Sequence, residues 1–348
     1  MSFDFECKRL DRGLAQSFAT LRDFSRLLQQ TYDFPGESRV DVRLNEERAI
    51  NARAFREAQT GVFVVEFTLG LVVWLDAAAA TIALRSSDVL AINPTPPSFL
   101  MPEAWRPIDL QAQLDLVTAA LPEDHLDLWQ NLFQSFLLSI FAHEVAHVVR
   151  GHLSFAKSLG AREGLDELAL RQRRGGLPSA TVRLLEFDAD AYAAFLLGRL
   201  VLAPPDVLPR WRRRSAQDSI VELVLGATLF FAALEVADQE SGDRAPAYPE
   251  PLLRMITMLV HLDQVWRERF PEQDFFEAGF EAALSVLVLL EPAYPQVDVL
   301  RQLLQPGFTS RLLRDAEPIL SEMEAFERLI LEHAFDGTGV WPPPELEE

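Results

Sequence analysis

The stretch Phe141–His152, FAHEVAHVVRGH, holds three of the six histidines in the 348-residue chain. It ends a segment, residues 126–150, in which aliphatic and aromatic side chains fall on nearly every face of a helix. A helix that is apolar all round belongs in the centre of a fold, so the pattern predicts a buried helix that Gly151 ends. Imidazole rings in such a helix need polar partners, because burial without them is costly.

His143 and His147 are four residues apart, which places both rings on one helix face, where they can bind the same metal ion. With Glu144 they form the pattern H-E-x-x-H. In zinc hydrolases this pattern supplies two metal ligands and a glutamate that takes a proton from the metal-bound water. The alternative is a set of hydrogen-bonded core histidines. A chance occurrence of the motif has a probability of roughly one per cent, which favours the metal.

A catalytic zinc ion usually has three protein ligands and leaves its fourth position to water. A third histidine at the spacing H-E-x-x-H-x-x-G-x-x-H is excluded, because position 153 is Leu153. On a continuing helix His152 would point about 140° away from the ligand face. We therefore expect His152 to be structural, either capping the helix end or bonding a nearby carboxylate.

The next apolar helix, expected over residues 181–201, offers carboxylates. Glu186 and Asp190 are four residues apart and share one helix face. We expect Glu186 to be the third metal ligand and Asp190 to accept a hydrogen bond from a ligand histidine. The alternative is a solvated helix start, where acidic residues favour the helix dipole. Asp188 is expected to be solvated.

Composition narrows the class of protein. Hydrophobic residues make up 49% of the chain and charged residues 24%, as in globular proteins. The net charge of −20 disfavours nucleic acid and anionic membranes as partners. Cys7 is the only cysteine, so no internal disulfide or cysteine-based metal cluster is possible. No secretory signal is visible, and the charge-free apolar runs are shorter than the roughly 20 residues that cross a bilayer. We expect a cytoplasmic protein without a membrane span.

The remaining elements follow from local patterns. Residues 47–69 predict a β-hairpin, because runs rich in Val, Phe and Thr flank the turn sequence REAQTG. The Pro-rich residues 92–107 predict a loop. Helices are expected over residues 10–32, 71–84, 215–238, 251–268, 275–290 and 310–335. The expected fold class is α+β and predominantly α-helical, with the small hairpin beside the H-E-x-x-H helix.

Two motifs together resemble the gluzincin metallopeptidases, particularly the M48 type. They are HEVAHVVRGH at 143–152 and EFDADAYA at 186–193. The run Asn51-Ala52-Arg53-Ala54, followed by Gly61, VFVVEF and Gly70-Leu71, is similar to a strand of that family. The resemblance covers roughly residues 48–85 and 126–200, and extends to about 260. It implies a zincin-like core in which Asn51, Ala52, Val64 and Val65 pair with extended substrate.

The chain also departs from the M48 pattern. Many M48 enzymes are membrane proteins, and the resemblance extends to the soluble phage-exclusion peptidases. A His-Pro pair before an Arg-bearing helix, found in many relatives, is replaced here by Tyr248-Pro249 with Arg254. The resemblance gives Tyr248 and Arg254 catalytic positions. A phenol can donate to a tetrahedral intermediate, or Tyr248 can simply pack before the helix.

The resemblance implies a single metallopeptidase-like domain over residues 1–348. Its core spans about 45–260, and a helical extension of unknown role follows at about 270–348. We expect a zinc-dependent endopeptidase that binds one Zn²⁺ and hydrolyses protein or peptide substrates with Glu144 as general base. The alternative is a catalytically silent zincin-like scaffold or regulatory binding protein. A di-iron bundle needs two E-x-x-H pairs, and the chain has only one.

Overall fold

The computed structural model describes the helical core, the sheet and parts of the C-terminal region. The described residues are 8–32, 34, 39–90, 123–160, 165–166, 177–204, 206–209, 211, 216–241, 251–272, 275–276, 279–280, 321–323, 325–326, 328–330 and 332–334. Most of these residues are helical, and they include a small sheet, which confirms the predicted α+β class with predominant helix.

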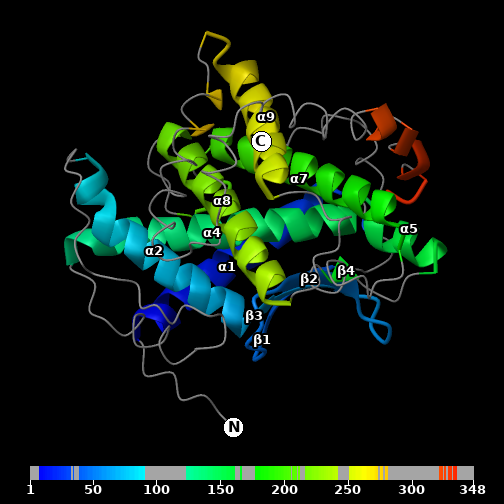
Figure 1. Cartoon of the computed structure of the whole chain (residues 1–348), viewed down its shortest axis with the longest axis horizontal. Coiled ribbons are helices and arrows are strands. Elements are labelled where there is room, and N and C mark those ends of the chain that lie inside the picture. The colour runs from blue at the N-terminus through cyan, green and yellow to red at the C-terminus, as the bar shows by residue number, and fades with distance from the viewer. Residues whose placement is uncertain are drawn as a thin grey trace.

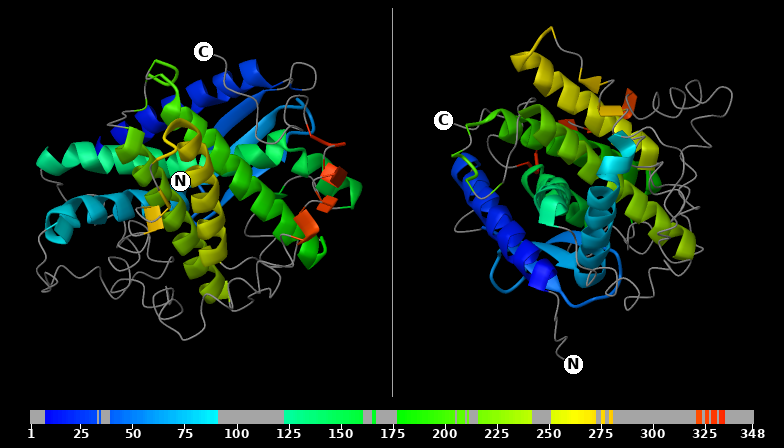
Figure 2. Two further views of the ribbon diagram at one scale, coloured as in Figure 1. Left: turned by 90° about the horizontal axis from the view of Figure 1, so that it is seen from above. Right: turned by 90° about the vertical axis from the view of Figure 1, so that its left-hand side faces the viewer.

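Helix α4, Glu123–Val149, is the central element of the fold. Every side chain from Trp129 to Val149 is buried. Figure 1 shows α4 crossing the molecule, and the right-hand view of Figure 2 looks along it, with the other long helices arranged around it. The segment His125–Val149 is apolar and long enough to cross a membrane, but its apolar window is entirely buried inside the structure, as in the core helix of a globular protein.

Six further helices are described in full. Five predicted helices are confirmed with slightly different ends, namely those over 10–32, 71–84, 181–201, 215–238 and 251–268. Their bounds, together with that of the short α5, are α1 Lys8–Thr31, α2 Leu69–Leu90, α5 His152–Ser158, α7 Ser179–Leu202, α8 Ala216–Ser241 and α9 Pro251–Arg269. The amphipathic pattern of α1 has its expected effect: Leu21, Phe24 and Leu28 are fully buried, while Arg22 and Arg26 are exposed.

The sheet has four strands in the order β1-β3-β2-β4. The predicted hairpin is confirmed as β2, Ala52–Arg56, antiparallel to β3, Phe63–Thr68, and its turn closes where the amide of Glu57 donates to the Val62 carbonyl at 2.8 Å. The sequence did not predict β1, Val40–Asn45, which runs parallel to β3, or the two-residue β4, Leu165–Asp166, which pairs with β2. The hairpin is therefore the interior of a mixed sheet.

One large hydrophobic cluster joins the sheet to the helices. It contains buried side chains from β1, β2 and β3 as well as from α1, α2, α4, α7, α8 and α9. Phe67 of β3 contacts Phe18 of α1, and Phe24 of α1 contacts Phe141 of α4, with ring centroids 5.9 and 5.8 Å apart. The sheet and α1 are thus held against the segment of α4 that carries the histidines.

Gly151 ends α4 as predicted. Its φ of 75° lies in the left-handed region, where glycine is favoured, and α5 begins directly after it. A Cβ at this position would lie 2.0 Å from the carbonyl oxygen of His333, so the C-terminal segment approaches the backbone closely here. Phe155 of α5 packs with Phe326 and Ile330 of the same C-terminal segment in a second, smaller cluster.

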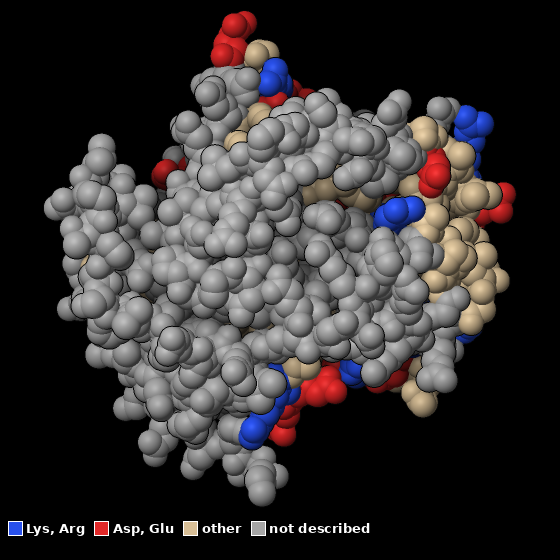
Figure 3. Space-filling model, in the orientation of Figure 1, with Lys and Arg blue, Asp and Glu red and all other residues tan. Residues whose placement is uncertain are grey.

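Several sequence-based predictions concern residues that lie outside the described set. These are the loop over 92–107, the greater part of the helix over 275–290, and much of the helix over 310–335. The division into a core at 45–260 and an extension at 270–348 stays a prediction. On the face drawn in Figure 3, basic and acidic side chains lie next to one another along the lower edge, so the charges of the described surface are interspersed there.

Candidate metal centre

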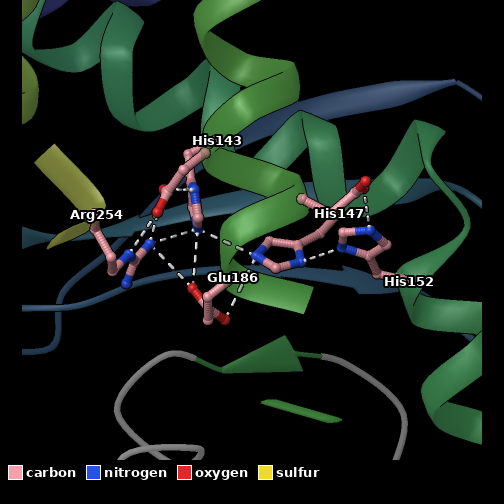
Figure 4. A network of polar contacts seen from close by, with 7 residues as sticks. His143, His147, His152, Glu186 and Arg254 are labelled. Atoms are coloured by element: carbon pink, nitrogen blue, oxygen red, sulfur yellow. Dashed lines mark hydrogen bonds and ion pairs between the residues drawn. The ribbon is translucent and has the colours of Figure 1, made fainter. Parts of the chain in front are cut away.

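A cluster of ionisable side chains lies inside the apolar core, where α4, α7 and α9 meet. Helix α4 contributes His143 and His147, α7 contributes Glu186 and Asp190, and α9 contributes Arg254. All five side chains are at most 1% exposed. Figure 4 shows the two imidazoles, the Glu186 carboxylate and the Arg254 guanidinium converging on one point. The spacing of four residues on α4 and on α7 thus produces the shared faces that the sequence predicted.

His143, His147 and Glu186 form a group that can hold a metal ion, with one ligand atom from each residue within 4.8 Å of the others. The Nε2 atoms of His143 and His147 are 3.1 Å apart. They lie 3.4 and 3.7 Å from the two carboxylate oxygens of Glu186. Ligands about 2.0–2.2 Å from a tetrahedral metal lie roughly 3.3–3.5 Å from one another. The two Nε2 atoms and the Glu186 carboxylate, which offers a different oxygen to each of them, therefore lie at separations close to those of ligands around a small tetrahedral ion.

A carboxylate and a guanidinium support His143. Its Nδ1 atom lies 2.9 Å from Oδ1 of Asp190, as the sequence predicted for this pair. Arg254 donates from Nε and Nη2 to the two oxygens of Asp190, at 2.7 and 3.0 Å. An ionised carboxylate only accepts, so Nδ1 of His143 is the protonated nitrogen and Nε2 faces the other donors.

A longer chain of contacts supports His147. Its Nδ1 atom lies 2.8 Å from Nδ1 of His152, and Nε2 of His152 lies 2.8 Å from Asp188. Arg150 donates to both oxygens of Asp188 at 2.8 Å. Because Asp188 accepts, His152 donates from Nε2 and accepts at Nδ1, which requires the proton of His147 to be on Nδ1. The Nε2 lone pair of His147 is left for the metal position.

The two networks assign both histidines the same tautomer, and this arrangement is the one a metal site needs. Each ligand histidine has its Nδ1 proton bound outward and its Nε2 directed inward. Two Nε2 lone pairs facing each other at 3.1 Å repel unless a cation or proton lies between them. The chemistry of the donor set thus fits a bound cation.

Two expectations about this region need correction. The 140° argument for His152 assumed that the helix continues, but the left-handed turn at Gly151 reverses the chain and returns His152 to His147. The expectation that it bonds a carboxylate is confirmed by its contact with Asp188. Asp188 itself is not solvated: it is 3% exposed and is held by Arg150 and His152.

The surroundings shift the pKa values of the clustered groups in different directions. Burial lowers the pKa of His143, but the hydrogen bond and charge of Asp190, with the hydrogen bond to Glu186, raise it to about 10. Burial holds the pKa of His147 well below its ordinary value and also lowers that of His152. Burial opposes ionisation of Glu186, but the charge of Arg254 and the bond to His143 hold its pKa well below the usual range.

Charge balance in the cluster leaves room for a cation. Its carboxylates are those of Glu186, Asp188 and Asp190, and its guanidiniums are those of Arg150 and Arg254. With neutral histidines, these groups leave one uncompensated negative charge. Either a proton on His143 or a bound cation compensates it.

The three residues expected to be catalytic, Glu144, Arg254 and Tyr248, differ in where they lie. Glu144 is 1% exposed and lies between the two ligand histidines in α4. Arg254 is fully buried, with Nη2 3.0 Å from Glu186 and 3.3 Å from Nε2 of His143, so it contacts the metal ligands themselves. Tyr248 lies outside the described residues.

The residues expected to pair with extended substrate do not present an open edge. Val64 and Val65 belong to β3, whose two sides pair with β1 and β2, so their assignment to a substrate-pairing edge needs correction. Asn51 has its amide and carbonyl bound by Thr68, and Ala52 is fully buried. The outer side of β2 pairs with β4. In the view of Figure 4, β4 is drawn below Glu186.

Sequence reasoning missed the roles of Arg150 and Asp188. Arg150 is fully buried, and its guanidinium lies 5.3 Å from the ring centroid of Tyr192, whose hydroxyl donates to that of Tyr32. A signal was present, since both charged residues occur in otherwise apolar helical sequence next to predicted ligands. If Arg150 and Asp188 had been predicted to be buried, their opposite charges would have implied that they pair with each other.

No family model, curated protein or solved structure matches the chain. The assignment of a function therefore rests on the geometry and chemistry of the cluster.

Proposed function

We propose that the protein is a zinc-dependent peptidase in which His143, His147 and Glu186 bind the metal. The observation that carries the proposal is a buried group in which the two inward-facing Nε2 atoms lie 3.1 Å apart and 3.4 and 3.7 Å from the two Glu186 oxygens, with one ligand atom from each residue within 4.8 Å of the others. Zinc prefers nitrogen and carboxylate ligands in tetrahedral geometry, and a three-ligand site leaves a position for water. The resemblance to gluzincins, which rests on the same residues, points to the same function.

When bound, zinc supplies a Lewis acid that lowers the pKa of a water molecule to about 7 and polarises the scissile carbonyl. Glu144 would serve as the general base that takes up a proton and passes it to the leaving amine. Asp190 and His152 hold the ligand imidazoles in their metal-binding tautomer. Arg254 orients Asp190 and Glu186, a positioning role in place of the catalytic position that the resemblance implied.

The first experiment is to measure zinc by mass spectrometry in purified wild type and Glu186→Ala. We expect about one zinc ion per wild-type chain and a large loss in the variant. Glu222→Ala is the matched control, because Glu222 is also buried but is not part of the metal-ligand cluster. Wild-type protein that stays metal-free after zinc is supplied would overturn the metal assignment.

The second experiment tests catalysis. Glu144→Gln removes the general base but keeps the shape of the side chain, so we expect zinc content to be retained and hydrolysis of a labelled unfolded protein to fall by about 10²–10⁴-fold. Hydrolysis by wild type should stop with a zinc chelator. Unchanged activity in Glu144→Gln contradicts the role assigned to Glu144.

A second candidate function is a catalytically silent scaffold or regulatory binding protein. Two observations favour it: the proposed ligands are at most 1% exposed, and Arg254 already supplies a positive charge 3.0 Å from Glu186. The peptidase and the scaffold predict different experimental results. The scaffold predicts that Arg254 and a protonated His143 hold the cluster together without zinc, and that no peptide is hydrolysed after zinc is added.

A further inference from the structure

The outer edge of the sheet at β1 is available for pairing. The amide of Phe63 donates to the carbonyl of Arg39 at 2.9 Å, so Arg39 and alternate residues after it face β3. The peptide groups of Val40, Val42 and Leu44 therefore face away from β3. Ser25 of α1 donates to the carbonyl of Val40 at 2.6 Å, which agrees with this orientation. Among the described residues no further strand pairs with this side of β1, where Leu44 is 43% exposed and Val42 is 8% exposed.

A groove of about 500 Å³ lies between α1 and this edge of β1. Helix α1 lines it with Arg22 and Arg26, which are one turn apart, and the segment of Arg39 and β1 lines it with Arg39, Asp41 and Arg43. Four arginines face one aspartate in this lining, which is a local exception to the net charge of −20 of the chain. Such a groove favours a ligand that carries negative charge.

The arginines of the groove can exchange their present partners for a ligand. Arg26 and Arg39 are 69% and 62% exposed, and each pairs with an aspartate at 3.0 Å. Exposed ion pairs of this kind contribute at most about 1 kcal/mol, because water competes for both groups. Arg22 has no ion pair with any residue that the structure describes. A carboxylate entering the groove therefore displaces little.

We propose that the groove between α1 and β1 binds an extended acidic peptide segment of a partner protein, which adds to β1 as a further strand. The backbone of the segment pairs with the outward groups of Val42 and Leu44, and its Glu or Asp side chains contact Arg22, Arg26, Arg39 and Arg43. A strand edge recognises peptide backbone, whereas arginines alone also bind nucleic-acid phosphates. The free edge thus favours a peptide.

The proposal is independent of the proposed peptidase function. The groove lies on β1, and the whole of β3 separates β1 from β2 and its partner β4. Loss of zinc or substitution of Glu144 leaves all groove residues in place. A negative result at the groove and a negative result at the metal centre can therefore be told apart.

The test is fluorescence anisotropy with a labelled eight-residue peptide of alternating Glu and Val, in the Glu144→Gln background so that the probe is not cleaved. We expect saturable binding that weakens with salt. The double variant Arg22→Glu/Arg39→Glu should weaken binding at least tenfold. Arg269→Glu, an exposed arginine at the end of α9, is the matched control and should leave binding within twofold.

Two further probes separate strand addition from charge alone. A peptide of alternating Glu and Pro has the same charge but cannot donate backbone hydrogen bonds from every second residue, and it should bind at least tenfold more weakly. Leu44→Pro removes an outward N–H at an edge position, where proline is tolerated, and should weaken the Glu-Val peptide specifically. Three outcomes overturn the proposal. They are equal binding of both peptides, tighter binding of a single-stranded oligonucleotide, and a loss of binding in Arg269→Glu as large as in Arg22→Glu/Arg39→Glu.

Discussion

At the scale of single residues, the proposed metal centre depends on side chains that set the proton positions of its candidate ligands. Asp190 and His152 each bind the Nδ1 of one ligand histidine, and each is held by a buried charged partner, Arg254 or Asp188. Both rings therefore direct Nε2 towards the metal position, and at His143, whose pKa is raised to about 10, metal binding would displace a proton. Such support groups commonly affect metal affinity nearly as much as the ligands do.

We predict that His152→Ala weakens zinc binding about 10–100-fold, because the Nδ1 proton of His147 loses its acceptor and the ring loses its orientation. Competition with a fluorescent chelator measures the change. His333→Ala is the control, since His333 lies in the C-terminal segment and contacts Ser154 and Phe155 instead of the ligands. An unchanged affinity in His152→Ala means that His147 is oriented by packing alone.

A pH dependence is expected from His261. Burial lowers the pKa of His261 to about 4, although the charges of Asp190 and Asp188 oppose this. The unfolded chain then binds a proton more readily than the folded one, so stability is full above about pH 6.5 and falls as the pH drops towards 4. His261→Phe keeps the ring that packs on Phe195 but cannot titrate. Its free energy of unfolding should fall less than that of wild type between pH 7.5 and pH 5, and an identical fall contradicts the assignment.

At the scale of secondary-structure elements, the turn at Gly151 decides where His152 lies. A continuing helix would carry His152 away from His147, whereas the left-handed residue reverses the chain and starts α5. The same glycine leaves room for the His333 carbonyl of the C-terminal segment. One backbone position thus joins the end of α4, the start of α5 and a segment almost 200 residues further along.

We predict that Gly151→Ala destabilises the protein more than Gly160→Ala does. Both glycines have positive φ, 75° and 86°, so both variants carry the left-handed penalty of roughly 1–2 kcal/mol. Only Gly151 has backbone atoms within 4 Å of the new Cβ, the nearest at 2.0 Å. Chemical denaturation should show an additional loss of at least about 1 kcal/mol for Gly151→Ala. Equal losses would mean that the C-terminal segment moves away without cost.

At the scale of the whole molecule, the fold is a large apolar core that encloses a cluster of charged groups. The cluster joins α4, α7 and α9, which also pack against one another through the main hydrophobic cluster. Buried charges of this kind stabilise a fold only when they are fully paired. In the proposed function, a bound divalent ion would add its binding energy to the stability of all three helices.

We therefore predict that zinc raises the unfolding temperature and that a chelator lowers it. A metal concentration 100-fold above the dissociation constant adds about 2.7 kcal/mol to the free energy of unfolding, because only the folded chain presents the complete site. Glu186→Ala should respond neither to zinc nor to the chelator. A wild-type transition that is insensitive to zinc favours the metal-free scaffold.

The sequence by itself determined the features that depend on local spacing. The central helix follows from its all-round apolar pattern, the shared faces of His143 with His147 and of Glu186 with Asp190 follow from the helical repeat, and the hairpin follows from β-prone runs around a turn. Each of these signals is contained within a few residues. The grouping of His143, His147 and Glu186 and the class of fold could therefore be predicted.

Only the tertiary structure decided the features that join distant parts of the chain. It placed β1 parallel to β3, closed the edge of β2 with β4, buried Asp188 against Arg150, and brought Arg254 from α9 to the ligands. None of these contacts has a periodic signature, because each depends on how whole elements pack. The partners of a buried charge are set by that packing, whereas its position on a helix is set by the local sequence.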